Sequence, residues 1–487
     1  MKYPLIPQED KKILCQISDF ALDNKAELYL VGGYLRDMLA GRRKENPDID
    51  FCLKKNAIAF SRRLCHKIGG GFVVLDKEHG CSRIVKKAGG KVYTIDFSDF
   101  RGKTLEDDLS LRDFTINSFA IRLKDFICKA NPAALFIDPL SGAKDLRAGL
   151  LKVDNDSSFD DDPLRLLRAF SFSAIFGFKI EKHTLRLITK NYKKLSLVSY
   201  ERIRDEVFKV LDCKSSADYF KKIDDLGILS LIMPEIDVMR GVRQGPYHHL
   251  DVFKHSMQTL RELELLFSQL KRNKELNACL NERICGDRKR SSLIKLGAFL
   301  HDIGKPKARR REGRKIKFHG HELIGRGIAS NIARRLKLSG DELDCLRIMI
   351  FWHLRPGYLA DNQVITARAK FRFFRDTKKE VVSVLLLSIA DQRSTRGPLT
   401  SEEERIHHEK VCLSLIKEYF RKAKENKPIK FINGDDLIRK FKLVPSPLIG
   451  RILAEIEELQ AVGKVKNKKA AFAFAAKIIR QTKLPHG

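Results

Sequence analysis

Two aspartates in the N-terminal part of the chain have the spacing of a divalent-metal site. Asp48 and Asp50 are two positions apart, with one residue between them, and a strand at this place would point both carboxylates to the same side. Adjacent carboxylates repel each other unless a cation joins them, and such oxygen ligands suit Mg²⁺ together with substrate phosphates. The alternative is a pair of exposed aspartates at a strand end. Asp96, on the predicted strand 92–97, is a candidate third carboxylate or a solvent-facing strand residue.

A glycine turn precedes these aspartates by about a dozen residues. Gly32 and Gly33 follow the apolar run 28–31, and Arg36 comes one turn later. Glycines allow the backbone to approach a phosphate closely, and the N-terminus of the following helix adds the positive end of its dipole. A Gly-Gly turn alone is often only a strand-to-helix connection. Its combination with the aspartate pair favours a nucleotide site.

Asp162 and Arg165 lie three residues apart at the start of a helical pattern. Both side chains can then project from one face of the helix. Arginine offers forked donors and aspartate offers acceptors, which are sufficient to pair with the Watson–Crick edge of C or A. The alternative is a capped helix start with an ion pair inside the helix.

The elements that must position these residues change character along the chain. Apolar and alternating runs predict strands at 28–31, 49–53, 72–75, 83–85 and 92–97, with a helix at 56–68. From about residue 163 the spacing predicts long amphipathic helices, at 164–176, 200–211 and 216–232. The basic stretches 271–292 and 305–317 are predicted as loops, and 422–430 as a linker.

These motifs, in this order, resemble the nucleotidyltransferase superfamily of DNA polymerase β type. The closer resemblance is to class II tRNA nucleotidyltransferases and bacterial poly(A) polymerases. Segment 111–117, LRDFTIN, is similar to the family motif R-R-D-F-T-x-N, with Leu111 in place of the first arginine. Segments 138–146, 161–169 and 201–206 are similar to the motifs that follow it.

The resemblance implies two-metal nucleotidyl transfer with Asp48 and Asp50 as the catalytic Mg²⁺ ligands. The other residues that it assigns to nucleotide binding are Gly32, Gly33 and Arg36 for the triphosphate, Arg112, Asp113 and Asn117 for the ribose and triphosphate, and Asp162, Arg165 and Arg168 in the base-reading motif.

A second set of candidate ligands lies in the C-terminal half. His301 and Asp302 end an apolar helical run, where burial is expensive unless the pair binds something. The segment resembles the HD-type metal phosphohydrolases. That resemblance implies a metal site of His255, His301, Asp302 and Asp391, extended in binuclear members by His321 and His353. Imidazoles mixed with carboxylates favour a transition metal such as Mn²⁺, Ni²⁺ or Fe²⁺ over Mg²⁺.

The sequence leaves the roles of several histidines near this set undecided. His319 competes with His321 for one ligand place, and His248 and His249 are expected to be structural or to support the ligands. Segments 433–437 and 445–450 resemble the helical tail of class II enzymes that carry an HD domain. Typical poly(A) polymerases of the class lack that domain, so the resemblance favours the tRNA enzymes.

The composition indicates an anionic partner. The 487 residues carry a net charge of +32, and 43% of them are hydrophobic, which is enough for several folded cores. Such a charge on a folded chain is typical of nucleic-acid binding. The stretch 305–317 and the lysines of 464–469 are expected to contact RNA phosphates. Ten cysteines without a CxxC pair and the absence of a long apolar run predict a cytoplasmic protein without membrane association.

The expected fold class is α+β: a polymerase β-type head with a mixed sheet, then an all-α neck and body, an HD domain and a helical tail. The predicted domains are 1–150 (nucleotidyltransferase head), 151–240 (nucleotide- and RNA-binding neck and body), 241–400 (HD metal phosphohydrolase) and 401–487 (helical tail).

The predicted function is addition of C and A from CTP and ATP to the 3′ end of tRNA, with a fused HD phosphohydrolase activity. The same motifs fit an enzyme that adds only CC, only A or a poly(A) tail. An HD phosphohydrolase with an idle RNA-binding head is a further alternative, and a signal-sensing protein nucleotidyltransferase is another. No feature of the sequence indicates the oligomeric state.

Overall fold

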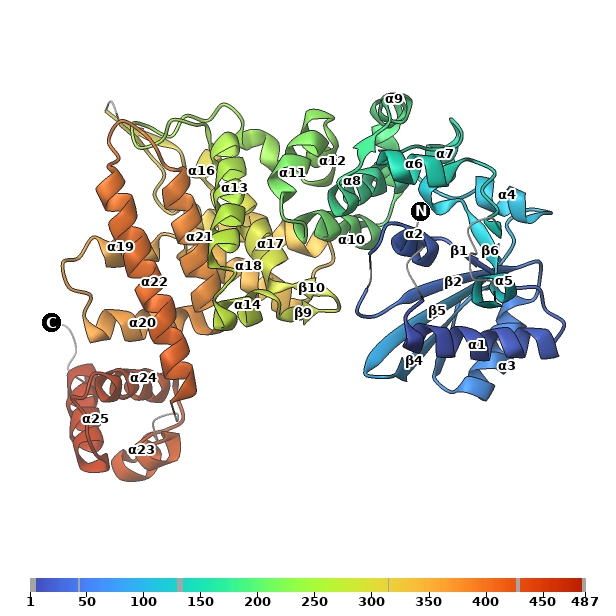
Figure 1. Cartoon of the computed structure of the whole chain (residues 1–487). Helices are drawn as coiled ribbons and strands as arrows, with labels where there is room; N and C mark the ends of the chain where they lie inside the picture. Colours follow the sequence, from blue (N-terminus) through green and yellow to red (C-terminus); the bar gives the residue numbers. More distant parts are fainter. Residues whose placement is uncertain (1–5, 43, 129–134, 314, 426–429, 484–487) are drawn as a thin grey trace. The chain divides into compact units, whose positions relative to one another are not determined.

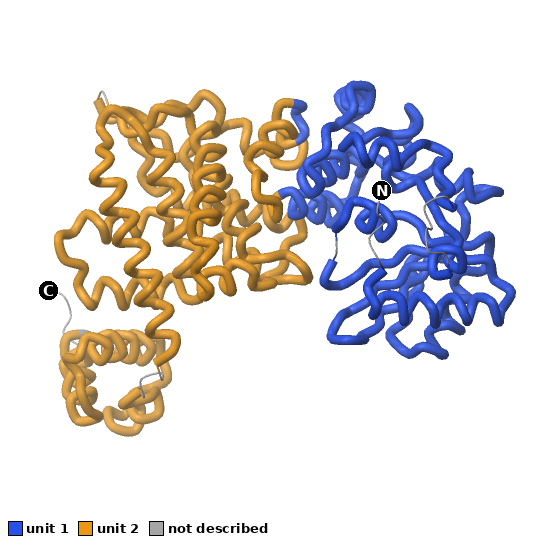
Figure 2. The backbone as a smooth tube through the Cα atoms, viewed as in Figure 1, with its two compact units in different colours: residues 1–210, 226–228 blue, residues 211–225, 229–487 orange. Residues whose placement is uncertain are grey.

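The computed structural model describes residues 6–42, 44–128, 135–313, 315–425 and 430–483. The chain divides into two compact units (Figure 2). Unit 1 comprises residues 1–210 with 226–228, and unit 2 comprises residues 211–225 with 229–487.

Unit 1 is built on a mixed six-stranded sheet with the strand order β3-β4-β5-β2-β1-β6 (Figure 1). Its strands are β1 (Tyr29–Val31), β2 (Asp48–Leu53), β3 (Gly71–Asp76), β4 (Cys81–Ala88), β5 (Lys91–Asp99) and β6 (Ala120–Arg122). The five predicted strands are confirmed, most of them one or more residues longer. β2 and β5 are parallel, and the other neighbouring strands are antiparallel.

Alternating burial over the first four residues of β2 separates a core face from a cavity face. Ile49 and Phe51 are fully buried, whereas Asp48 is exposed and Asp50 is half-buried. Phe51 stacks on Phe97 of β5 with ring centroids 5.3 Å apart. The predicted helix α3 (Ala57–Ile68) covers β4 and β5. Burial of the apolar face therefore fixes the direction in which the two aspartates point.

Helices complete unit 1. They are α1 (Gln8–Asp23), α2 (Gly33–Leu39), α4 (Leu105–Ser110), α5 (Leu123–Cys128), α6 (Gly142–Ala148), α7 (Ser158–Asp161), α8 (Arg165–Phe176), α9 (Lys182–Asn191) and α10 (Tyr200–Leu211). A short parallel pair of strands, β7 (Leu150–Leu151) and β8 (Lys179–Ile180), lies on either side of α7 and α8 in the sequence. The helices predicted at 164–176 and 200–211 are confirmed.

The described part of unit 2 is helical apart from two small hairpins. Its larger helices are α13 (Val252–Leu270), α15 (Arg290–Leu300), α17 (His321–Arg335), α18 (Gly340–Trp352), α20 (Ala367–Thr377), α21 (Val381–Ser394) and α22 (Glu402–Lys424). α13, α15 and α21 contact one another, and α15 also contacts α18. The last helices, α23 (Gly434–Phe441), α24 (Pro447–Ala461) and α25 (Lys468–Lys483), enclose an apolar cluster of their own.

Three predictions about helical and loop segments are wrong. The segment 271–292 contains α14 (Lys274–Leu280) and a hairpin of β9 (Arg283–Cys285) and β10 (Arg288–Lys289). The segment 305–317 contains α16 (Lys305–Ala308) and a hairpin of β11 (Arg310–Glu312) and β12 (Lys315–Lys317). The helix predicted at 216–232 is interrupted at Gly227, whose φ of +77° ends α11 (Ser216–Asp225) before α12 (Ile228–Ile232).

The linker predicted at 422–430 is wrong at its start, because α22 continues to Lys424, and residues 426–429 lie outside the described part. The apolar segment 381–390 is a buried stretch of α21. Among the described helices, none combines the length and the apolar character needed to cross a membrane.

Candidate active sites

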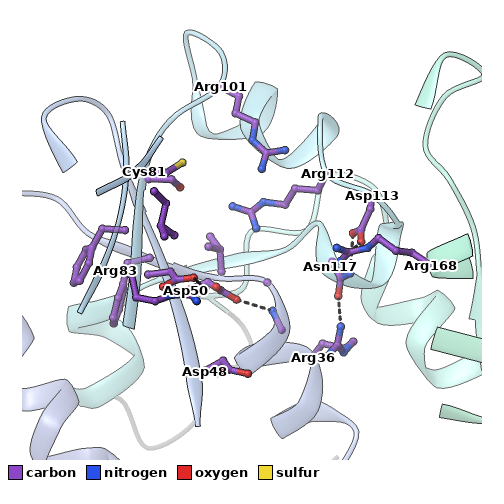
Figure 3. A pocket seen from close by; sticks show the side chains of 18 of the residues that line it. Arg36, Asp48, Asp50, Cys81, Arg83, Arg101, Arg112, Asp113, Asn117 and Arg168 are labelled. Atoms are coloured by element: carbon purple, nitrogen blue, oxygen red, sulfur yellow. Dashed lines mark hydrogen bonds and ion pairs between the residues drawn. The ribbon is translucent and has the colours of Figure 1, made fainter. Parts of the chain in front are cut away.

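One cavity of about 490 Å³ in unit 1 brings the predicted head residues together (Figure 3). Its lining includes all eleven of them: Gly32, Gly33, Arg36, Asp48, Asp50, Arg112, Asp113, Asn117, Asp162, Arg165 and Arg168. They come from the β1–α2 turn, α2, β2, the segment after α4, the residue directly after α7 and the first turn of α8. Residues up to 136 positions apart in sequence therefore face the same space.

The glycine turn lies directly against Asp50. The Gly33 N–H donates to Asp50 Oδ2 at 3.3 Å. Gly32 has a φ of +69°, and a Cβ on it would lie 3.0 Å from Asp50 Oδ2 and 3.3 Å from Arg112 Nη1. Both the backbone conformation and the space therefore require glycine at this position.

Burial raises the pKa of Asp50, and the negative charge of Asp96 raises it further. The two residues are opposite each other in the parallel β2–β5 register. Asp48, at the exposed end of β2, pairs with Lys44 at 2.8 Å. A bound cation would therefore stabilise the ionised carboxylates at this edge of the cavity, and their oxygen donors fit Mg²⁺.

A polar network along the wall of the cavity connects three of the motifs. Arg36 donates to Asp37 at 2.6 and 2.9 Å and to Asn117 Oδ1 at 2.7 Å. Asn117 donates in turn to Asp113 at 2.8 Å, and Arg168 pairs with Asp113 at 2.7 Å. Burial disfavours the charge of Asp113, but Arg168 and Asn117 outweigh that effect, and the pKa of Asp113 is lowered. The network fixes α2, the turn at residues 115–117 and α8 against one another.

Asp162 and Arg165 both line the cavity without pairing with each other. Asp162 is extended just before α8 and binds Arg202 at 2.8 Å. Arg165, the first residue of α8, is buried and donates to Ser158 Oγ at 2.9 Å and to the Leu111 carbonyl at 2.7 Å. The structure therefore does not support the alternative, an ion pair between Asp162 and Arg165 inside the helix.

Several further residues line the cavity that the sequence motifs do not indicate, among them Arg83 and Arg101. Arg83 holds Asp96 through two hydrogen bonds of 2.8 Å. The hairpin could have revealed this pair, because a two-residue Gly-Gly turn between Ala88 and Lys91 puts Arg83 opposite Asp96. Asp96 thus faces the cavity and not bulk solvent. Arg101 extends toward the cavity from the segment before α4 (Figure 3), where no pattern marked it.

The six predicted HD residues form one cluster in unit 2, in which Asp391 is half-buried and the other five are buried. His255 Nε2 lies 2.9 Å from Asp391 Oδ1, and His301 Nε2 lies 3.2 Å from Asp302 Oδ2. His321 and His353 approach the other Asp302 oxygen, at 3.3 and 3.8 Å. Two groups, His255–His301–Asp391 and His301–Asp302–His353, have donor atoms close enough together to hold a metal ion.

Backbone contacts aim the imidazoles at the centre of the cluster. Nδ1 of His301, His321 and His353 lies 2.7–2.8 Å from the carbonyl oxygen three residues earlier in each case. A ring that donates from Nδ1 presents the lone pair of Nε2 to the cluster. Nε2 of His301 is buried and has no hydrogen-bond partner of good geometry. This donor set fits a transition metal.

The charges around the cluster also favour a bound metal ion. Burial disfavours a charged His301, but Asp302 and Asp391 outweigh it and raise the pKa of His301 to about 10. Burial and then the charge of His301 lower the pKa of His353 to about 3. The carboxylates therefore create a potential that favours a cation at this centre.

The structure shows which of the remaining histidines belong to the cluster. His321 is buried in the cluster, whereas His319 is exposed. His248 packs edge-on against His255 with ring centroids 4.8 Å apart, and His249 is exposed. Lys305, predicted as part of a basic loop, is instead buried, with its amine 2.7 Å from Asp302.

Family comparisons match most of the chain. Residues 28–152 match the Poly A polymerase head domain, and residues 252–396 match the HD domain. Residues 177–239 match the "Probable RNA and SrmB- binding site of polymerase A", and residues 409–475 match tRNA nucleotidyltransferase domain 2.

An A-adding tRNA nucleotidyltransferase of Deinococcus radiodurans is 31% identical over 93% of this chain and 96% of that protein. The chain belongs to the tRNA nucleotidyltransferase family. Another relative of this tRNA nucleotidyltransferase is a CC-adding enzyme of Synechocystis, 27% identical over 92% of this chain and 93% of the other. A Thermotoga maritima CCA-adding enzyme complexed with tRNA has the same fold, with a TM-score of 0.59, 22% identity, and coverage of 98% and 97%.

The predicted family and the α+β fold class are therefore confirmed, and the protein is a nucleotidyltransferase. Its head and HD domains both imply dependence on divalent metal ions.

Proposed function

We propose that this tRNA nucleotidyltransferase adds C and A, from CTP and ATP, to the 3′ end of tRNA without a nucleic-acid template. One observation carries the proposal: a carboxylate pair, a glycine turn and the Asp162–Arg165 pair line a single cavity. A metal site beside forked donors and acceptors provides for phosphoryl transfer and for base selection in one place.

Each group of cavity residues has its own role in this proposal. Asp48 and Asp50 hold Mg²⁺, which when bound neutralises the triphosphate and favours ionisation of the attacking hydroxyl. Gly32 and Gly33 leave room for the triphosphate, and Arg36 positions it directly or through Asn117. Arg112, Asp113 and Asn117 orient the ribose, and Arg168 holds Asp113 ionised. Asp162 and Arg165 pair with the edge of the base.

The deciding experiment supplies tRNAs that end before CCA, after C and after CC, with one nucleotide at a time. We expect C on the first two substrates and A on the third. Asp50→Ala should abolish all three additions and leave tRNA affinity nearly unchanged, since it removes a metal ligand and no positive charge. Incorporation by Asp50→Ala at the wild-type rate would contradict the metal assignment.

Addition of A alone is the second candidate. The observation that favours it is the 31% identity to an A-adding enzyme over nearly the whole chain. In the same experiment, A added to the tRNA ending in CC, with no C added to either shorter tRNA, would replace the first proposal by this one.

We further propose that the HD cluster is a phosphohydrolase centre for 2′,3′-cyclic or terminal phosphates. Its support is the imidazole-rich donor set and the orphaned His301 Nε2. His255, His301, Asp302 and Asp391 would hold one transition-metal ion such as Mn²⁺, Ni²⁺ or Fe²⁺, and His321 and His353 would extend the site to a second.

The double variant His301→Ala/Asp302→Ala should lose the metal-stimulated hydrolysis and keep nucleotide addition within about a few-fold of wild type, because the two centres lie in different compact units. Each metal is returned separately after chelation, and both activities are measured. A matched collapse of both activities would show that these residues hold the fold or the tRNA instead.

The remaining proposals concern the domain boundaries, the cellular location and the partners. The proposed domains are the head (1–150), neck and body (151–240), HD domain (241–400) and tail (401–487), and the change from mixed sheet to helices supports the first of these boundaries. A cytoplasmic location is supported by the ten cysteines without a CxxC pair. tRNA, CTP and ATP are the proposed partners.

A further inference from the structure

A basic groove on unit 2 belongs to neither proposed active site. It consists of two cavities of about 560 and 460 Å³ that share Arg326 of α17 and Arg347 of α18. We name it the α17–α18 groove. Six cations line it, against two acids, Asp341 and Asp344: Lys307, Arg326, Arg334, Arg347, Lys378 and Lys379. None of these residues is a ligand in the HD cluster.

Two aromatic side chains lie among these cations. Phe351 and Trp352, at the end of α18, contact each other edge-on with ring centroids 4.9 Å apart, and both are half-buried. The Arg326 guanidinium stacks over Phe351 at 4.6 Å from the ring centroid. Aromatic faces and stacked guanidinium groups between phosphate-binding cations are the elements that bind unpaired bases.

The acids of the groove neutralise only part of its charge. Lys379 lies 3.2 Å from Asp341, and Arg347 lies 3.5 Å from Asp344. Arg326 and Arg334 have neutral partners, the Phe351 ring and Asn331 respectively. The groove therefore keeps a positive excess on the face where its aromatic rings lie.

We propose that the α17–α18 groove binds single-stranded RNA, with an unpaired base stacked against Trp352 and the flanking phosphates on the arginines of α17 and α18. Each cavity lies within the roughly 300–1,000 Å³ of ordinary ligand sites, so together they accept more than one nucleotide. A duplex keeps its bases stacked internally and offers none to Trp352, which favours single strands. This RNA surface is independent of which nucleotides the head adds.

Trp352 provides a local readout, because it is the only tryptophan of the chain. An unstructured RNA of ten nucleotides is titrated into the full-length protein in low salt with a chelator that stops hydrolysis. We expect saturable quenching of the tryptophan fluorescence. The absence of quenching would overturn the proposal, and equal quenching by a duplex of the same length would overturn the preference for single strands.

Variants test whether the groove itself makes the contact. Arg334→Gln/Arg347→Gln should weaken the quenching affinity about tenfold and flatten its salt dependence, since two phosphate contacts are lost. Lys410→Gln/Lys417→Gln on α22 is the matched control, with the same charge change at two exposed positions outside the groove. Equal weakening in both variants would overturn the proposal, because only net charge would then matter.

The head activity is measured on the same preparations. If nucleotide addition fails while the quenching behaves as expected, the proposed function of the head is wrong and the RNA groove stands. If addition is normal and quenching is absent, the reverse holds.

Discussion

At the scale of the residue, Gly32 is the position where backbone and catalytic carboxylate meet most closely. Its φ of +69° is accessible to glycine, and an added methyl group would press on Asp50 Oδ2. We expect Gly32→Ala to lower nucleotide addition at least about tenfold, which corresponds to ~1.4 kcal/mol of transition-state stabilisation. Gly41→Ala is the control: Gly41 also has a positive φ, of +67°, and no atom of the described residues lies within 4 Å of an added Cβ. Single-nucleotide incorporation rates compare the two, and equal losses would show that backbone strain alone matters.

At the scale of the element, a buried arginine joins the start of α15 to the turn before α21. Arg290 is 2% exposed and binds both Glu380, which is fully buried, and Glu282, whose side chain is 51% exposed. Glu380 also accepts from Ser383 Oγ at 2.8 Å. We expect Glu380→Gln to reduce the free energy of unfolding of unit 2 by about 3 kcal/mol, because it leaves a buried guanidinium with less compensation.

Glu282→Gln makes the same chemical change on the exposed partner and should cost at most about 1 kcal/mol. Urea unfolding followed by Trp352 fluorescence reports unit 2 specifically, since this tryptophan lies on α18. Equal shifts of the urea unfolding midpoints of the two variants would mean that burial of Glu380 does not increase the contribution of its ion pair to stability.

At the scale of the whole molecule, the net charge of +32 predicts how tRNA binding responds to salt. Each neutralised phosphate releases counterions, so log K should fall linearly with log[salt]; about six contacted phosphates would give a slope of about −5. Filter binding of tRNA between low and physiological salt measures the slope. A flat response would mean that the positive charge serves another purpose.

Features that depend on local periodicity can be predicted from the sequence. The alternation of Asp48 and Asp50 with Ile49 and Phe51 predicts both the strand and the shared direction of the carboxylates, because the side-chain period of a strand is two. The helices 164–176 and 200–211 followed from apolar spacing in the same way. Residue spacing and a family resemblance together indicate the eleven head residues, and a second resemblance, carried by histidines and aspartates, indicates the six HD residues.

Contacts between residues far apart in the sequence become apparent only in the folded chain. His319 and His321 are two residues apart, and only the packing of α17 against α18 puts His321 beside His353. Arg36 reaches Asn117, 81 positions away, and Asp96 is held by Arg83. The hairpins within 271–292 and 305–317 were missed because their polar, basic strands carry no apolar alternation. Their positions come from pairing and from ion pairs such as Arg288–Glu342, which local patterns do not encode.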